Sequence, residues 1–278
     1  MQIFKTKLEL TRFLSSLEMR KSIGFAPTMG ALHEGHLQLI KQSKKECDIT
    51  VCSIFVNPTQ FNSETDLENY PNTIKEDLLK LENLNCDIAY VPKADDLYGK
   101  NEKAKEFDFG RLSTTMEGEF RPGHFNGMAT IVEEFFNIIK PTKAYFGQKD
   151  LQQLQIVKCL VKQTKSAIEI IGVPTIREES GLAKSSRNAL LTKEGKKDAS
   201  LIFECLNYCR ANKNKGINFL KLYIKTKFDK LKSFELEYVE IVALNSMLPI
   251  KQWGKENENA ICIATYVDGV RLIDNIIL

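Results

Sequence analysis

The sequence predicts an α/β protein with a Rossmann-like parallel sheet, followed by a smaller α+β domain. Between residues 23 and 174, short β-rich apolar runs alternate with segments of helical periodicity. The runs are apolar throughout, which is typical of parallel strands covered by helices on both faces. After residue 174 the order changes to two long helical patterns and then strands. We therefore expect one domain over residues 1–176 and a second over residues 177–278.

The first domain is expected to alternate strands with helices. The strands are residues 23–28, 49–57, 87–91, 144–147 and 168–174. The helices between them are residues 35–47, 73–84, 127–139 and 151–164. Alternation of this kind predicts right-handed crossovers, and ligands of such sheets bind beyond the carboxyl ends of the strands. The segments that follow the strands are therefore the candidate functional segments.

The second domain is expected to contain helices first and a small sheet afterwards. The helices are residues 193–212 and 216–231, and the strands are residues 235–242, 260–267 and 270–275. Asp268 and Gly269 form a good hairpin turn between the last two strands. No internal repeat or low-complexity segment interrupts this order.

The composition predicts an ordinary soluble protein of the cytoplasm. The chain has 278 residues, 43% of them hydrophobic, and its apolar runs are far shorter than the roughly 20 residues that a membrane helix needs. The N-terminus lacks the features of a secretory signal. The net charge of +3 is spread out, so we expect neither a nucleic acid nor a membrane as partner. The seven cysteines show no CxxC pair and are expected to be reduced.

The turn after the first strand contains two of the three histidines in the chain, His33 and His36. They lie three residues apart at the predicted start of a helix, where side chains share a face and free backbone N–H groups favour phosphate. Gly35 between them lets a flat ligand lie against the backbone. The same spacing also fits a metal pair or two surface histidines, and this turn alone does not separate the alternatives.

Two side-chain amides, Asn57 and Gln60, follow the second strand. An amide both donates and accepts, which suits a small molecule with hydroxyl and carboxylate groups. The alternative is a turn at Pro58 whose amides cap the next helix.

The segment after the strand at residues 144–147 contains Lys149, Asp150 and, one turn later, Gln153. Gly147 permits close backbone approach, the lysine offers a point charge for phosphate, and the aspartate can accept from ribose hydroxyls. The alternative is an ordinary helix start with a Lys–Asp pair.

The stretch between the domains, residues 181–188, places two serines between a lysine and an arginine. Hydroxyls beside cations suit a pyrophosphate on which negative charge develops. A polar linker has the same composition. What favours one site over four unrelated turns is that all four segments converge on one face of the same predicted sheet.

Taken together, the segments resemble the pantothenate synthetase family, the pantoate–β-alanine ligases of the nucleotidylyltransferase superfamily. The resemblance spans nearly the whole chain and is carried by PTMGALHEGH (27–36), SIFVNPTQF (53–61), NYPNT (69–73), EGEFRPGHFNGM (117–128), FGQKDLQQ (146–153), GVPTIRE (172–178), GLAKSSRN (181–188) and RLIDN (271–275). It implies a ligase of pantothenate biosynthesis that joins pantoate to β-alanine with ATP, through a pantoyl adenylate, and releases AMP and pyrophosphate.

The resemblance also implies roles for individual residues. His36 is the expected proton donor, and the other catalytic candidates are His33, Lys149 and Arg187. The expected ATP-binding residues are Met29, Gly30, Ala31, Leu32, His33, Glu34, Gly35, His36, Gly147, Gln148, Lys149, Asp150, Ile176, Lys184, Ser185, Ser186 and Arg187. The expected pantoate contacts are Gln60, Gln153 and Asn57, and Gln60 also borders the β-alanine site. Mg²⁺ is expected with the ATP, with Asp77 as an indirect metal contact.

The resemblance also implies a role for the C-terminal domain, an oligomeric state and a role for His124, and this chain departs from the family pattern at two positions. The C-terminal domain is expected to act as a lid that excludes water from the adenylate, and the protein is expected to be a homodimer. Lys184 stands where the family usually has a large apolar residue, and Gln148 stands where it usually has glutamate. His124 is expected to order a loop near the opening of the site.

Other functions fit less well. Another small-molecule nucleotidylyltransferase would need a cation-rich phosphate acceptor site, whereas this chain has an amide set. A regulatory module without catalysis would be expected to have lost His36, Lys149 or Arg187, and all are present. An aminoacyl-tRNA synthetase would need a further, anticodon-binding domain.

Overall fold

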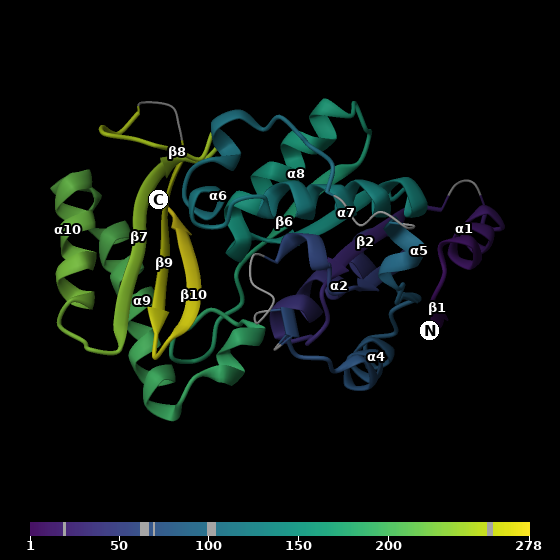
Figure 1. The fold of residues 1–278 in the computed structure, drawn as a ribbon, viewed down its shortest axis with the longest axis horizontal. Coiled ribbons are helices and arrows are strands. Elements are labelled where there is room, and N and C mark those ends of the chain that lie inside the picture. Colours follow the sequence, from purple (N-terminus) through teal and green to yellow (C-terminus); the bar gives the residue numbers. More distant parts are fainter. Residues whose placement is uncertain (19–20, 62–66, 69, 99–103, 255–257) are drawn as a thin grey trace. The chain divides into compact units, whose positions relative to one another are not determined.

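The computed structural model describes residues 1–18, 21–61, 67–68, 70–98, 104–254 and 258–278. The chain packs as two compact units. The first consists of Met1–Gln148 and Ile156–Pro174, and the second of Lys149–Gln155 and Thr175–Leu278. The short segment Lys149–Gln155, which the sequence places in the first domain, therefore packs within the second unit. Figure 1 shows the elements of both units coloured along the chain.

The first unit is built on a six-stranded parallel sheet with the strand order β1-β4-β3-β2-β5-β6. Its strands are β1 (Gln2–Phe4), β2 (Ile23–Thr28), β3 (Ile49–Ile54), β4 (Ile88–Tyr90), β5 (Lys143–Gly147) and β6 (Glu169–Val173). The strand order runs outward in both directions from the neighbours β2 and β5, which makes their carboxyl ends the switch point of the sheet. The predicted fold class is confirmed, and every predicted strand of this sheet is present.

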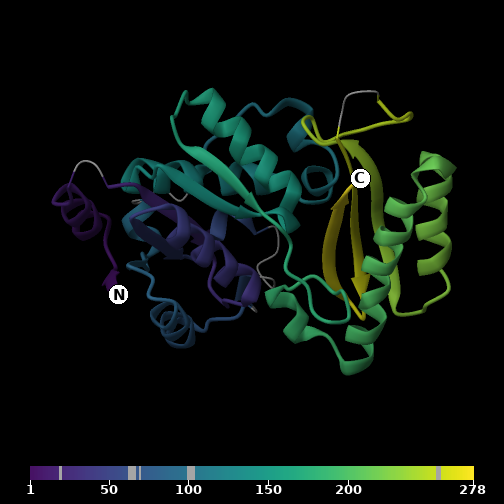
Figure 2. The same ribbon diagram turned by 180° about the vertical axis from the view of Figure 1, so that it is seen from behind.

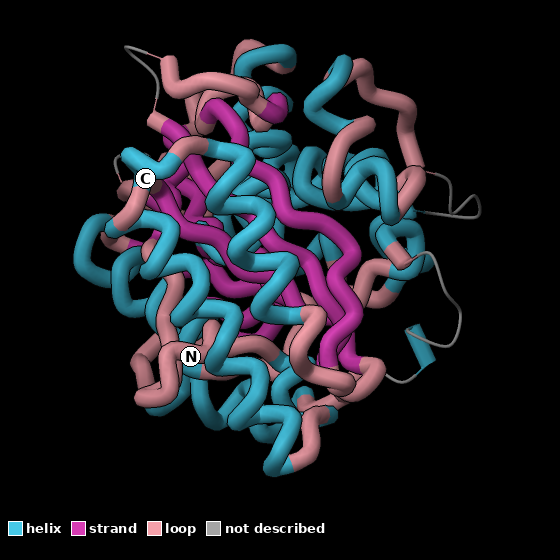
Figure 3. The backbone as a smooth tube through the Cα atoms, turned by 90° about the vertical axis from the view of Figure 1, so that its left-hand side faces the viewer, coloured by secondary structure: helices cyan, strands magenta, loops and turns pink. Residues whose placement is uncertain are grey.

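Helices cover both faces of this sheet. The helices of this unit are α1 (Lys7–Ser15), α2 (Glu34–Glu46), α4 (Ile74–Asn83), α5 (Ala94–Tyr98), α6 (Glu117–Phe120), α7 (His124–Ile139) and the part of α8 (Leu151–Gln163) from Ile156 onward. On one face, Ala26 of β2 packs in a buried cluster with Leu39 of α2. On the other, Phe25 and Tyr90 meet the ring of Phe135 of α7 edge to face. Figure 3 separates the strands, in magenta, from the helices around them, in cyan.

Pairing between β2 and β5 is short. It covers only Gly24 and Phe25 on β2, while pairing with β3 continues to Thr28. Pro27 follows two residues after Phe25 and has no N–H to donate to a ladder. The two strands therefore part toward their carboxyl ends, where the turns before α2 and α8 begin.

The second unit contains an antiparallel sheet with the order β10-β9-β7-β8. Its elements are α9 (Lys193–Ala211), α10 (Ile217–Phe228), β7 (Phe234–Ala243), β8 (Leu248–Pro249), β9 (Asn259–Val267) and β10 (Val270–Ile277). Leu206 of α9 and Ile224 of α10 share one buried cluster with Ile241 and Ile263 of the sheet. Figures 1 and 2 show these helices beside the strands.

The hairpin between β9 and β10 has the predicted turn. Asp268 and Gly269 both have positive φ, +49° and +77°, as a two-residue hairpin turn of type I′ requires. Within the described ranges, every helix is too short or too polar to span a lipid bilayer.

Candidate active site

The turn between β2 and α2, which leads to the two histidines, has an unusual backbone. Gly30 and Ala31 both have positive φ, +85° and +49°. This conformation is costly for a residue with a Cβ. The buried carboxylate of Asp77 in α4 stabilises it, because its two oxygens accept from the N–H groups of Ala31 and Leu32, each at 2.8 Å. Thr73 Oγ1 donates to the same carboxylate at 3.0 Å.

His33 and His36 differ in their place on the helix. The sequence predicts a helix from Gly35 that presents both side chains on one face, whereas α2 begins at Glu34 and His33 is its N-cap, with φ −127° and ψ 174°. As a cap residue, His33 has extended backbone dihedral angles, its side chain accepts from an N–H of the first turn, and its own N–H donates to the side chain of His36. The two imidazole rings nevertheless stack, with centroids 4.0 Å apart.

The helix start also determines where each ring carries its proton. The N–H of Gly35 donates to Nδ1 of His33 at 3.1 Å, and the N–H of His33 donates to Nδ1 of His36 at 3.4 Å. A ring nitrogen that accepts a hydrogen bond carries no proton, so each neutral ring is protonated at Nε2. Both histidines are therefore set as Nε2–H donors by the backbone of the turn. Among the described residues, no three His, Cys, Asp or Glu side chains gather as a metal-binding group.

The amide segment after β3 lies against this turn. It forms the short 3₁₀ helix η1 (Pro58–Gln60), and Gln60 is buried. The Nε2 atom of Gln60 lies 3.0 Å from Sδ of Met29. The structure therefore brings together the segments that follow β2 and β3, as the parallel sheet predicts.

Asn57 holds Gln60 in place. Its Nδ2 donates to Oε1 of Gln60 at 3.2 Å and to the main-chain oxygen of Gly127 at 3.1 Å. Its Oδ1 accepts from the hydroxyls of Tyr98 and Thr59 at 2.5 and 3.1 Å. These four hydrogen bonds use both protons and both acceptor positions of the amide, so Asn57 acts on its neighbours within the fold.

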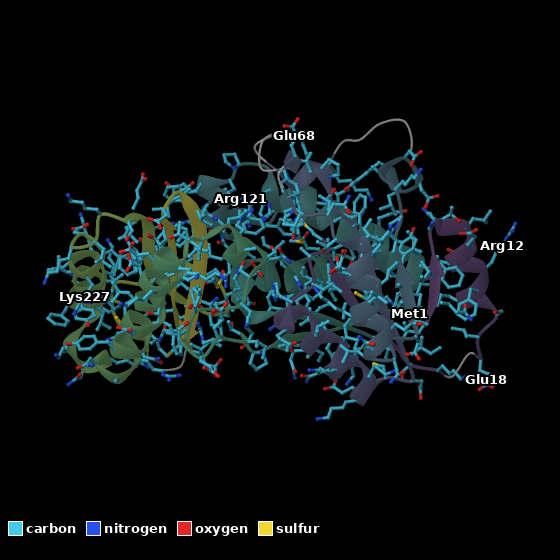
Figure 4. The ribbon with its side chains drawn as sticks, turned by 90° about the horizontal axis from the view of Figure 1, so that it is seen from below. Met1, Arg12, Glu18, Glu68, Arg121 and Lys227 are labelled. Atoms are coloured by element: carbon cyan, nitrogen blue, oxygen red, sulfur yellow. The ribbon has the colours of Figure 1, made fainter. Side chains whose placement is uncertain are left out.

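The third histidine, His124, orders the same segment. Its Nδ1 lies 2.8 Å from the main-chain oxygen of Gln60, and its Nε2 lies 3.2 Å from a guanidinium nitrogen of Arg121. A carbonyl oxygen only accepts and a guanidinium only donates, so His124 is a neutral ring protonated at Nδ1. Arg121, which Figure 4 labels, also lies 3.6 Å from the carboxylate of Glu117.

The second unit contains the candidate residues that follow β5. Lys149 and Asp150 lie in the 3₁₀ helix η3 (Gln148–Asp150), and their charged atoms are 3.7 Å apart. Gln153 lies in the first turn of α8 and is half-buried. The main-chain oxygen of Lys149 accepts from Nδ2 of Asn275 in β10 at 2.8 Å, a contact that sequence reasoning missed.

The serine-rich stretch forms a small hairpin in the second unit. Arg177 and Ala183 form an antiparallel bridge, and the N–H of Lys184 donates to the main-chain oxygen of Ile176 at 2.8 Å. The structure thus brings together two residues that the resemblance assigns to ATP. Ser185 caps the 3₁₀ helix η4 (Ser186–Leu190), because its Oγ accepts from the N–H of Arg187 at 3.3 Å.

The family model for pantoate–β-alanine ligases matches residues 2–277. The chain belongs to the pantoate–β-alanine ligase family. This ligase is 46% identical over 279 residues to the pantothenate synthetase of Azobacteroides pseudotrichonymphae, covering 99% of each chain. It is 43% identical to that of Christiangramia forsetii, over 100% of this chain and 99% of the relative. The family and enzyme class that the sequence predicts are confirmed.

Solved structures agree with this ligase over its whole length. The pantothenate synthetase from Thermus thermophilus superposes with a TM-score of 0.92 at 34% identity, covering 99% of each chain. The pantoate–β-alanine ligase from Francisella tularensis, described as a complex with β-γ ATP and β-alanine, gives 0.84 at 36% identity. That match covers 100% of this ligase and 97% of the Francisella chain.

Proposed function

We propose that this ligase activates pantoate with ATP as pantoyl adenylate and then transfers the pantoyl group to β-alanine. In the first step a carboxylate oxygen of pantoate attacks the α-phosphorus of ATP, and pyrophosphate leaves. In the second step the amine of β-alanine attacks the acyl carbon and loses a proton, and AMP leaves with pantothenate formed. The Francisella relative, whose description includes β-γ ATP and β-alanine, supports both substrates.

The observation that carries the proposal is the start of α2. Its capping box sets His33 and His36 as Nε2–H donors beside a helix N-terminus, where backbone N–H groups and the helix dipole already favour phosphate. Negative charge grows on the α-phosphate and on the leaving pyrophosphate as the bond to the leaving oxygen breaks. Positioned donors stabilise that charge, and we assign His36 the role of proton donor.

The remaining assignments follow the side-chain chemistry. Gln60 and Gln153 hold pantoate, and Gln60 borders the β-alanine site. Asn57 contributes by positioning Gln60, because its own amide is fully used within the fold. Gln60 is anchored twice, through its side chain and through its main-chain oxygen, which suits a residue that must present one amide in one orientation.

The second set of residues binds the nucleotide. Lys149 and the loop at residues 184–187 contact the phosphates, Asp150 accepts from the ribose, and the backbone of Ile176 contacts adenine. Mg²⁺ accompanies ATP and screens its triphosphate. Both oxygens of Asp77 accept backbone N–H groups, so only an indirect contact with that ion fits the geometry. The lid role of residues 177–278 and the homodimer stay predictions.

An oxygen-labelling experiment tests the proposal. The protein is incubated with ATP, Mg²⁺ and pantoate labelled with ¹⁸O in its carboxylate, with and without β-alanine. The expected result is pantothenate and AMP only in the complete mixture, with one ¹⁸O in the AMP phosphate. Label in inorganic phosphate would indicate an acyl phosphate instead. Absence of AMP that depends on β-alanine would overturn the proposal, and a nucleotide retained on the product would support another nucleotidylyltransferase.

A further inference from the structure

Two adjacent polar residues, Asp274 and Asn275, are buried in the last strand of the second unit. Their exposed fractions are 4% and 7%. Burying a carboxylate and an amide in a strand is costly unless both are fully hydrogen-bonded. Both lie in the RLIDN motif, to which the proposed function assigns no role.

Asp274 fixes the arginine at the base of the serine-rich hairpin. Its two oxygens accept from the two terminal nitrogens of Arg177, at 2.6 and 2.9 Å. The same guanidinium donates to the main-chain oxygen of Gly181 at 3.1 Å and lies 3.8 Å from the ring centre of Phe203. A planar group held on its edge by a carboxylate and on its face by a ring has one orientation. Asp274 therefore determines where the start of the loop at residues 181–188 lies.

The loop begins at Gly181, which packs closely against the ring of Phe203. Its φ is +89°, and a Cβ built on it would lie 2.5 Å from Cδ1 of Phe203. The stacked ring thus contacts both the guanidinium and the glycine that leads the loop. A shift of the Arg177 side chain would therefore be transmitted through the ring of Phe203 to Gly181.

Asn275 fixes the other candidate phosphate-binding segment. Its Nδ2 donates to the main-chain oxygen of Lys149 at 2.8 Å. Its N–H donates to Oδ1 of Asp274 at 2.7 Å, and its main-chain oxygen accepts from Arg177 at 3.3 Å. One dipeptide of β10 therefore holds Lys149 and the hairpin together.

We propose that Asp274 and Asn275 are positioning residues for adenylation, which set the place of Lys149 relative to the loop at residues 181–188. The inference rests on the proposed function, because it takes both segments to bind the triphosphate. Neither residue needs to touch substrate. Two cationic segments from distant parts of the chain can stabilise one pyrophosphate only if their spacing is held before the nucleotide arrives.

Separate assays of the two half-reactions test this inference in the full-length protein. The variants are Asp274→Asn, Asn275→Ala and Arg177→Lys, which keeps the charge of the arginine but loses its two-pronged geometry. The first assay measures pyrophosphate released from ATP and pantoate without β-alanine. The second measures pantothenate formed from synthetic pantoyl adenylate and β-alanine. Urea unfolding of each variant reports its stability.

Glu237→Gln is the matched control. Glu237 of β7 pairs with Arg271 of β10 at 3.1 Å, so this variant weakens an arginine–carboxylate pair of the same sheet. Neither partner has a role in the proposed site. It therefore reports what the loss of such a pair does to stability alone.

We expect the three variants to slow pyrophosphate release by about tenfold to a hundredfold, the cost of misplacing a reacting group by about 1 Å. Turnover of the supplied adenylate should stay within about twofold of the parent protein, since that step no longer involves the triphosphate. Equal losses in both half-reactions, or losses no larger than those of Glu237→Gln, would overturn the inference. If Asp274→Asn fails to fold, Asn275→Ala, which leaves the ion pair intact, gives the answer.

The proposed function can fail separately. Failure of the parent protein to release pyrophosphate from ATP and pantoate, or to convert synthetic pantoyl adenylate, would contradict the proposed function itself. Undiminished pyrophosphate release in Lys149→Ala would contradict the phosphate-binding role of Lys149, on which the inference rests. Normal behaviour of the parent protein together with unaffected positioning variants would contradict only the inference.

Discussion

Single residues in the turn after β2 obtain their chemistry from backbone neighbours. Imidazole has two possible neutral forms, and the spacing of His33 and His36 favours neither. The capping box selects the Nε2–H form in both, because backbone N–H groups donate to each Nδ1. Asp77 in turn holds the strained turn from which this cap begins.

Variants of His36 separate its role in the cap from its role as a donor. His36→Asn keeps an acceptor near the position of Nδ1 but removes the Nε2–H, so we expect native stability and a loss of about 2 to 4 kcal/mol of transition-state stabilisation. His36→Ala removes both the donor and the acceptor, so we expect the same loss of activity together with a loss of about 0.5 to 2 kcal/mol of stability. Steady-state kinetics and urea unfolding measure the two effects. Unchanged kcat in His36→Asn would remove His36 from the mechanism.

Replacing Asp77 by asparagine should disturb the turn from a distance. An asparagine offers one oxygen to two backbone N–H groups, so one buried donor loses its partner at a cost of about 1 to 3 kcal/mol. We expect the free energy of unfolding to fall by that amount and KM for ATP to rise. Glu76→Gln, an exposed neighbour on the same helix, is the control. A shift in the Mg²⁺ requirement with unchanged stability would instead favour the indirect metal contact.

Two glycines show how whole elements approach one another. Gly127 lets α7 pack against η1, since a Cβ there would lie 2.1 Å from the main-chain oxygen of Thr59. At Gly147, the last residue of β5, an added Cβ meets no described atom within 4 Å. The fold needs the first glycine for packing, whereas it does not need the second.

Alanine at these positions should therefore give opposite results. Gly127→Ala is expected to lower stability by about 1 to 3 kcal/mol through overpacking and to raise KM for pantoate, because η1 carries Gln60. Gly147→Ala is expected to keep or slightly raise stability and to raise KM for ATP, because a Cβ would enter the space of a nucleotide lying against the backbone. Thermal unfolding and substrate titrations measure both. An unaltered KM for ATP in Gly147→Ala would contradict nucleotide contact there.

Buried thiols link the stability of the whole molecule to alkaline pH. Burial raises the pKa of Cys205 and Cys209 in α9 to about 12, and that of Cys86 to about 11, above the ordinary value of 9.0. These thiols stay protonated in the folded state after they would ionise in the unfolded chain. Their contribution to stability is therefore complete below pH 9.0 and is lost as the pH rises toward the folded-state pKa values.

We expect the free energy of unfolding to fall as the pH rises above 9.0. Each proton retained only by the folded state changes it by about 1.4 kcal/mol per pH unit. The double variant Cys205→Ala/Cys209→Ala should show a shallower fall, whereas Cys159→Ala, at a partly exposed position, should follow the parent protein. Urea unfolding across this pH range measures the slopes. Equal slopes for the parent protein and the double variant would contradict the assignment.

Periodicity predicted the long elements of the molecule well and the short ones poorly. The run Ile23–Thr28 is a strand with the predicted bounds, because a short, continuous apolar run rich in β-forming residues is typical of a buried parallel strand. The strand β1, with three residues, is too short to show a period, and the helix α1 is a short surface helix that buries only Leu10; both were missed. The predicted start of α7 was three residues late, because Gly123 and Gly127 weaken the helical pattern there.

The sequence by itself determined the fold class, the order of the strands along the chain, the segments that carry the chemistry and the family of this ligase. Those properties depend on local periodicity and on the types of residue within single motifs. Only the tertiary structure decided the proton positions of the histidines, the burial of Asp77 and the contacts of Asp274 and Asn275. The proton positions depend on the backbone conformation at the start of α2. The contacts of Asp77 and Asn275 depend on partners 46 and 126 residues away, and no local pattern identifies such a partner. A carboxylate in a motif shows that chemistry is present, and the fold determines whether it meets a ligand or the backbone that holds one.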